Sequence, residues 1–241
     1  MATEEASHII KSFEQELNKL RALLSEMGGL VESEVALACD AVLDRDSGAA
    51  GRAVETDPQV DALERDVEQF VIRLLALRQP MAQDLRLIVA GLKITGDLER
   101  IGDYAANVAK RSLVLEQYSL PFTFAGLASM SRLVQENLKS VIDAIGENDA
   151  EKAQEVWRAD EGVDAIYNAL FRELITYMME DPRNITPCTH LLFIAKNLER
   201  IGDHATNIAE TVYYAVTGDT LDGARPKGDS SAYAVVRPPR E

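Results

Sequence analysis

The segment LERIGDYAANVAK at residues 98–110 recurs as LERIGDHATNIAE at residues 198–210. Six identical residues in a row are hard to obtain by chance, so the repeat indicates that one structural unit is present twice. Each copy carries Glu, Asp and Asn at successive four-residue steps. In an α-helix this spacing places the three side chains along one face. The sequence therefore predicts two related helical units, each with an acidic face.

Apolar residues recur at three- and four-residue steps along most of the chain, and no alternating strand pattern of useful length occurs. The pattern predicts an all-α fold of two pseudo-symmetric antiparallel three-helix bundles, with six helices in all. The first bundle is expected over residues 1–118 and the second over 119–217. Residues 218–241 are rich in Gly, Pro, Ser and Arg and are predicted to be a disordered tail.

Several short segments contain helix breakers and predict where helices begin and end. Asp57 and Pro58 are expected to start a helix, with Asp as the cap and Pro in the first turn. Pro121 is expected to separate the two halves. The remaining predictions are an interruption at 45–51, a helix end at 78–80, a turn at 146–149 and a connector at 180–187.

Acidic residues lie symmetrically about the predicted turn of each helical hairpin. Asp57 and Asp61 are one helical turn apart, as are Glu99 and Asp103, and the turn near Pro80 lies midway between the two pairs. Four carboxylates are therefore expected at one level of each bundle, lining a groove at its surface. The predicted metal ligands are Asp57, Asp61, Glu99 and Asp103 in the first half and Asp160, Asp164, Glu199 and Asp203 in the second.

A metal ion would offset the repulsion in such a cluster, because like charges one turn apart are unfavourable even in water. Ligands that are all oxygen favour hard cations such as Mg²⁺, Mn²⁺, Ca²⁺ or iron. A solvated acidic face is the usual meaning of one acidic pair, but two repeats with level-matched partners favour metal binding. Glu64 and Glu68 correspond to Tyr167 and Phe171, so equal metal occupancy of the two halves is not expected.

Other residues of the repeated segments have simpler interpretations. Arg100 and Arg200 are expected to form ion pairs or to guide an anion. Gly102 and Gly202 are unfavourable in a helix interior, so they indicate close helix approach or room for an ion. His204 replaces Tyr104 and is interpreted as a hydrogen-bonded or surface histidine rather than a ligand.

Composition excludes several partners. The formal net charge of −15 argues against nucleic acid and anionic lipid, which recruit basic surfaces. No apolar run approaches the roughly 20 residues that cross a bilayer, so membrane insertion is not expected. The N-terminal segment lacks the apolar core of a secretion signal. The protein is therefore expected to be cytoplasmic.

Enzymatic motifs are missing from the sequence. Di-iron carboxylate bundles need Glu-x-x-His on two helices, and only Glu5 and His8 fit that spacing. There is no Gly-x-Ser-x-Gly segment and no glycine loop that cradles phosphate. We therefore expect a protein that is not an enzyme.

The doubled E-R-I-G-D word, the two D-x-x-x-D pairs and the plan of twice three helices resemble the PhoU family over residues 5–217. The resemblance implies a cytoplasmic negative regulator of the phosphate-starvation response. It implies that the protein links the high-affinity phosphate ABC transporter, through its ATPase subunit, to a sensor histidine kinase. It further implies a homodimer and metal ions such as iron, magnesium, manganese or zinc at the eight carboxylates.

Two alternatives follow from the same acidic faces. One is a carboxylate-bridged metal-dependent enzyme on a helical bundle, against which the missing histidine ligands and nucleophile speak. The other is a passive metal or phosphate buffer, which would bind stoichiometrically without a signalling effect.

Overall fold

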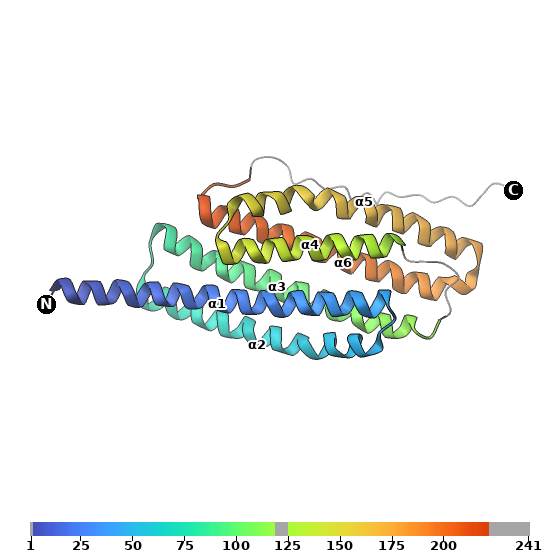
Figure 1. Ribbon diagram of the computed structural model, residues 1–241, viewed down its shortest axis with the longest axis horizontal. Helices are drawn as coiled ribbons and strands as arrows, with labels where there is room; N and C mark the ends of the chain where they lie inside the picture. Colours follow the sequence, from blue (N-terminus) through green and yellow to red (C-terminus); the bar gives the residue numbers. More distant parts are fainter. Residues whose placement is uncertain (1, 119–124, 222–241) are drawn as a thin grey trace.

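The computed structural model describes residues 2–118 and 125–221, with side chains from Ser12 onward. This part of the chain contains no strand. The axes of its six α-helices are roughly aligned with one another, and consecutive helices run in opposite directions (Figure 1). The all-α prediction is therefore confirmed. The helices are α1 (Ala2–Leu43), α2 (Ser47–Arg78), α3 (Ala82–Leu115), α4 (Ala125–Glu147), α5 (Ala150–Glu180) and α6 (Ile185–Thr217), with the 3₁₀ helix η1 (Pro182–Asn184) before α6.

Helices α1–α3 pack against one another, and so do α4–α6. The two groups lie side by side, joined by contacts of α3 with α6 and of α1 with α4 (Figure 1). None of the described helices has an apolar stretch that could cross a membrane. The predicted boundary between residues 118 and 119 borders residues 119–124, which lie outside the described residues. Residues 222–241 of the predicted tail (218–241) also lie outside them.

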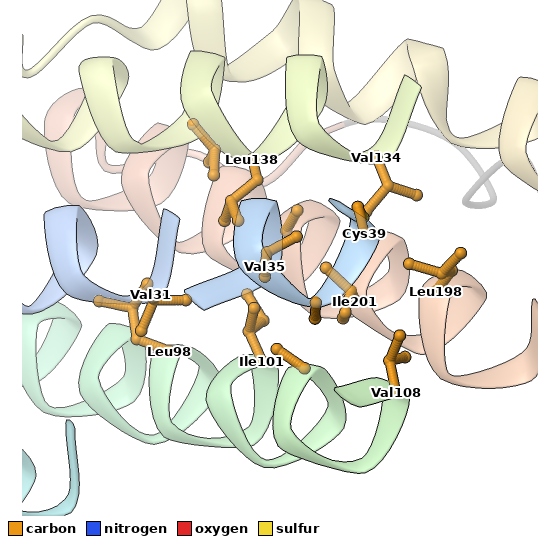
Figure 2. Close-up of a cluster of buried hydrophobic side chains, with 14 of the residues drawn as sticks. Val31, Val35, Cys39, Leu98, Ile101, Val108, Val134, Leu138, Leu198 and Ile201 are labelled. Atoms are coloured by element: carbon orange, nitrogen blue, oxygen red, sulfur yellow. The ribbon is translucent and has the colours of Figure 1, made fainter. Parts of the chain in front are cut away.

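One continuous hydrophobic core runs through both groups of helices. Figure 2 shows Val35 of α1 between Ile101 of α3, Leu138 of α4 and Ile201 of α6. All four side chains are fully buried. Burying an aliphatic side chain of this size contributes about 1.5–3 kcal/mol. The helical periodicity of the sequence thus accounts for the core.

Polar and aromatic contacts also join α3 to α6. His204 Nδ1 lies 2.7 Å from Asp97 Oδ1, and the imidazole stacks on the Tyr104 ring at 5.6 Å between centroids. The interpretation of His204 as a hydrogen-bonded histidine is therefore confirmed. Tyr104 and His204 occupy the same position in the two repeats, so the repeats meet at this point.

The prediction that Asp57 and Pro58 begin a helix is wrong, because α2 begins at Ser47 and Pro58 lies inside it. Asp46 is the cap, and its Oδ1 accepts a hydrogen bond from the backbone of Ala49 at 3.0 Å. An interior proline costs about 3 kcal/mol in a helix. The helix persists because its earlier turns bury the small side chains of Ala49, Ala50 and Ala53.

The other breaker predictions agree with the described residues in part. Helix α2 ends at Arg78, before left-handed Gln79. Asn148 and Asp149 form the turn before α5, with Asp149 as its cap. The interruption expected at 45–51 is a turn between α1 and α2 at residues 44–46, and residues 47–51 already belong to α2. The connector expected at 180–187 is shorter, since α6 begins at Ile185.

Replacing Pro58 by Ala is expected to raise the free energy of unfolding by about 1–3 kcal/mol, because it restores a backbone donor to an exposed helix interior. Urea unfolding followed by circular dichroism measures this. Pro182→Ala is the control, because Pro182 lies in the first turn of η1, where proline is well tolerated. Equal effects of the two substitutions would contradict the explanation.

Candidate metal centre

The first predicted cluster lies where α2 and α3 run antiparallel. Asp57 and Asp61 on α2 and Glu99 on α3 are half-buried, and Asp103 on α3 is exposed. Burial, followed by the charge of Asp103, raises the pKa of Asp57. Burial also raises the pKa of Glu99, together with the charges of Asp103, Glu64 and Asp61. Acids of the two helices therefore act on one another, as the level matching predicted.

Glu64 belongs to the same cluster. Burial raises the pKa of its carboxyl, and the charges of Glu68, Asp61 and Asp103 raise it further. Arg100, inside the repeated word, lowers the pKa of Glu99 by its positive charge but leaves burial and repulsion dominant. The cluster thus holds more negative charge than its neighbouring cation offsets.

Glu34 of α1 is a member of this cluster that sequence reasoning missed. Its side chain is fully buried, and neither carboxyl oxygen has a hydrogen-bond partner among the described residues. Burial raises its pKa to about 9, helped by the charges of Asp57, Asp103 and Asp61 and opposed by Lys110. The available signal was an acidic residue inside the apolar stripe of Val31 and Val35.

Gly102 leaves the space that the Glu34 carboxyl occupies. A Cβ atom at residue 102 would lie 3.2 Å from Glu34 Oε2 and 3.5 Å from Val60 Cγ1. At Gly202 the three atoms nearest the corresponding Cβ belong to Val163, at 3.5 Å or more, which is ordinary contact distance. The two glycines therefore differ: Gly102 makes room for a carboxyl, whereas the position of Gly202 has room for a methyl group.

The residues of the first cluster fit a hard cation. A buried polar atom without a partner costs about 1–3 kcal/mol, and a cation would remove that cost at Glu34. In the described ranges, no three acidic, histidine or cysteine side chains converge closely enough to hold an ion as they stand. Binding would therefore require these carboxylates to turn toward one another.

The second cluster differs in its burial. The exposed fractions of Asp160, Asp164 and Glu199 are only 3%, 5% and 5%, and Asp203 is half-buried. The acids of the first half are half-buried or exposed, whereas the prediction that the second cluster lies at the surface is wrong for Asp160, Asp164 and Glu199. At the positions of Glu64 and Glu68 the second half has Tyr167 and Phe171, whose ring centroids lie 6.4 Å apart.

Donors of the protein itself satisfy acids of the second cluster. The Thr206 hydroxyl donates to Asp160 Oδ1 at 3.0 Å. Lys196 Nζ donates to Glu199 Oε1 at 2.8 Å and lies 4.9 Å from the centre of the Tyr167 ring. This arrangement is a buried, charge-paired network rather than an open acidic face.

Two further residues of the repeat have structural contacts. Arg200 lies over the Tyr104 ring at 5.5 Å, which is a cation–π contact. Asn207 Nδ2 is 3.5 Å from Asp97 Oδ1 and adds a weak link between α3 and α6. Neither contact involves the predicted ligands. Glu5 and His8 lie where the structure describes no side chains.

Comparison with known proteins reveals a domain matched twice. The matching family model is the PhoU domain, at residues 24–112 and again at residues 127–212. Each matched segment contains one LERIGD copy. The duplication predicted from the repeated word therefore coincides with two copies of a known domain.

The similar curated proteins are named "Phosphate-specific transport system accessory protein PhoU homolog". The one from Rhizobium meliloti (strain 1021) is 48% identical over 227 residues, which cover 94% of this chain and 96% of the relative. The one from Caulobacter vibrioides (strain NA1000 / CB15N) is 51% identical over 223 residues, which cover 92% and 97%. The similarity therefore extends over nearly all of both relatives.

Solved structures agree with this similarity. PhoU from Pseudomonas aeruginosa matches with a TM-score of 0.84 at 44% identity, over 86% of this chain and 100% of that one. The phosphate transport system regulatory protein PhoU from Streptococcus pneumoniae matches with a TM-score of 0.80 at 32% identity, over 87% and 99%.

Glu34→Gln is expected to stabilise the metal-free protein increasingly as pH rises. The folded state keeps the Glu34 proton up to about pH 9, whereas the ordinary pKa is 4.5, so wild-type stability falls across that window. The amide cannot ionise and escapes this loss. The difference in melting temperature between the two proteins, measured in EDTA, should be larger at pH 8.5 than at pH 5. Glu26→Gln is the control, because Glu26 lies exposed on the same helix. A melting-temperature difference between Glu34→Gln and the wild type that does not change with pH would contradict the raised pKa of Glu34.

Gly102→Ala and Gly202→Ala should differ although both add one methyl group to a helix. Ala is favoured over Gly in a helix by about 1 kcal/mol, and the site at Gly202 accepts the methyl at ordinary contact distance. Gly202→Ala is therefore expected to raise the free energy of unfolding. Gly102→Ala is expected to raise it less or not at all, because the added methyl group crowds the Glu34 carboxyl. Urea unfolding measures both. Equal stabilisation would show that Glu34 does not need the space.

Proposed function

The chain belongs to the PhoU family, and from this premise we propose that it is a negative regulator of the phosphate-starvation response. In this role it represses the response when phosphate is plentiful. It links the high-affinity phosphate ABC transporter to a sensor histidine kinase. The observation that carries the proposal is the pair of matched PhoU domains, which together span most of the chain.

The extent of the similarity supports a whole-protein role. The relatives named as accessory proteins of the phosphate-specific transport system are matched over nearly their full length. Their name describes an accessory protein rather than an enzyme, which supports a non-enzymatic role here. Accessory function requires partners, and we assign these as the ATPase subunit of the transporter and the cytoplasmic portion of the kinase.

The charge of the chain supports this choice of partners. A formal net charge of −15 favours basic protein surfaces over nucleic acid or anionic lipid. We place the protein in the cytoplasm, where the ATPase subunit and the kinase portion are accessible. A homodimer would present the acidic surface twice.

The metal part of the proposal rests on the first cluster. Asp57, Asp61, Glu99 and Asp103 would hold the ion, with Glu34 reaching it from α1 beneath. A bound Mg²⁺, Mn²⁺, Ca²⁺ or iron ion would supply positive charge and oxygen coordination. Helices α1, α2 and α3 contribute the carboxylates, and the charges of Arg100 and Lys110 offset their repulsion only in part. Metal binding would therefore tie α1, α2 and α3 together.

A passive metal buffer is the alternative that the partnerless Glu34 also supports. Such a protein would bind the same ion but leave phosphate signalling unchanged. A signalling assay therefore separates the two functions directly.

We expect a strain lacking this gene to secrete alkaline phosphatase strongly in abundant phosphate, and the wild-type chain to restore low secretion. A variant carrying Asp57→Asn, Asp61→Asn, Glu99→Gln and Asp103→Asn should fail to restore it. The control neutralises four exposed acids elsewhere: Glu26, Asp40, Asp143 and Glu155. Immunoblots confirm equal protein levels.

Low secretion in the deletion strain would contradict the regulatory role and favour the buffer. Full repression by the first-cluster variant would leave the regulatory role intact and refute the metal part.

A further inference from the structure

The two carboxylate clusters share their motif residues but differ at the positions around them. The offset that aligns Asp57 with Asp160 places Asn137 opposite Glu34 and Tyr167 opposite Glu64. The offset that aligns Glu99 with Glu199 places Lys196 opposite Gly96 and Thr206 opposite Ala106. Relative to the first cluster, the second therefore lacks the acids at these two positions and gains Lys196 and a hydroxyl. Lys110, whose charge acts on Glu34 and Asp57 in the first half, is replaced by Glu210.

Lys196 is placed to act as the counter-ion of the second cluster. Its ammonium is 2.8 Å from Glu199 Oε1, and the Glu199 side chain is only 5% exposed. The same ammonium lies 4.9 Å from the centre of the Tyr167 ring. A buried carboxylate is stable only when it is paired, and Lys196 supplies that pairing from the preceding turn of α6.

Thr206 completes the difference. Its hydroxyl donates to Asp160 Oδ1 at 3.0 Å, so an acid from the neighbouring helix α5 also has a donor. Ala106, at the corresponding position of the first repeat, has no hydroxyl to donate. One oxygen of Asp160 on α5 and one oxygen of Glu199 on α6 thus have donors that belong to the chain, although Glu199 Oε2 accepts no hydrogen bond from the described residues.

The first cluster has the opposite character. Glu34 is fully buried, with its carboxyl next to Gly102, and the charges of Asp57 and Asp103 act on it. Neither of its oxygens has a hydrogen-bond partner in the described part of the chain. Gly96 carries no side chain, and a Cβ atom there would meet nothing within 4 Å. The position that holds Lys196 in the second half is therefore open space in the first.

We propose that Lys196 is the resident cation of the second cluster and that a divalent metal ion binds at the first cluster alone, with Glu34 as an added ligand. This inference rests on the metal part of the proposed function. The two PhoU domains then differ chemically: a metal ion neutralises the carboxylates of the first, whereas a lysine side chain does so in the second. Only the first can then respond to metal concentration.

The substitutions that exchange the two environments test the proposal in the purified full-length chain. Gly96→Lys installs the cation in the first cluster, and Lys196→Met removes it from the second while keeping an unbranched stem. Gly29→Lys is the charge-matched control, because a Cβ atom at exposed Gly29 also meets nothing within 4 Å. Mn²⁺ is the probe, measured by electron paramagnetic resonance and calorimetry after EDTA treatment.

Local readouts distinguish the two clusters. Asp103→Asn and Glu34→Gln perturb the first, and Asp203→Asn perturbs the second. Trp157, the single tryptophan, lies one turn before Asp160 on α5, so its fluorescence reports on the second cluster alone. A shift of melting temperature on Mn²⁺ addition provides a third measurement that does not depend on any activity.

The proposal expects Mn²⁺ affinity to fall in Gly96→Lys, Glu34→Gln and Asp103→Asn but to stay unchanged in Gly29→Lys and Asp203→Asn. Loss of a supporting group at a metal site costs about 10- to 100-fold in affinity, and an added cation is expected to cost at least as much. Lys196→Met should gain a further class of Mn²⁺ site that alters Trp157 fluorescence, whereas Mn²⁺ should leave that fluorescence unchanged in the wild type.

Equal loss of Mn²⁺ binding in Asp103→Asn and Asp203→Asn would overturn the proposal while leaving the metal part of the function standing. Unchanged Mn²⁺ binding in Lys196→Met would overturn the role of Lys196. No Mn²⁺ binding by the wild type at millimolar concentration would overturn both the proposal and the metal part. Repression in the alkaline phosphatase assay would then show whether the regulatory function survives without it.

Discussion

Carboxylates at the joint between packed helices must be neutralised, and this requirement organises both halves of the molecule. Repulsion between neighbouring acids and the loss of hydration on burial both oppose ionisation. In the first half Lys110 opposes these effects only in part, and burial and neighbouring acids still raise the pKa of Glu34 to about 9, so that a proton neutralises it. In the second half Lys196 and Thr206 supply the relief through an ion pair and a hydrogen bond.

The same requirement connects the clusters to the contact between the halves. Helix α3 carries Glu99 and Asp103, and on either side of this pair it carries Asp97 and Tyr104, which contact His204 of α6. Helix α6 likewise carries Glu199 and Asp203 next to His204. Any force that draws α3 toward α1 and α2 at the first cluster therefore acts within one turn of the joint to the second half. The fold places the charged sites and the contact between the halves on the same two helices.

The sequence alone was sufficient to predict those features of the structure that depend on helical periodicity. The doubled LERIGD word, the apolar stripes and the symmetric positions of the acids predicted an all-helical fold and the meeting of α2 and α3 at one level. Glu34 was missed because an acid in an apolar stripe lies far from the other members in sequence and resembles a single imperfection of the pattern. Pro58 misled because proline usually marks a first turn, whereas here the burial of Ala49, Ala50 and Ala53 maintains the helix around it. The burial of Asp160 and Asp164 was missed because it depends on tertiary packing, which the spacing of the acids does not reveal.

A repeated motif therefore predicts where side chains lie more reliably than it predicts how their charges are neutralised. The eight motif carboxylates are of identical type in the two halves, and spacing alone assigns them the same role. What differs is outside the motif: a glycine where the other half has a lysine, an alanine where it has a threonine, and a buried glutamate where it has an asparagine. Each of these positions alters the charge balance without disturbing the helix pairing, because Gly96 opens onto free space and Asn137 remains buried in place of Glu34. Duplicated domains can thus keep one fold and one acidic framework while their electrostatic requirements are met by different means.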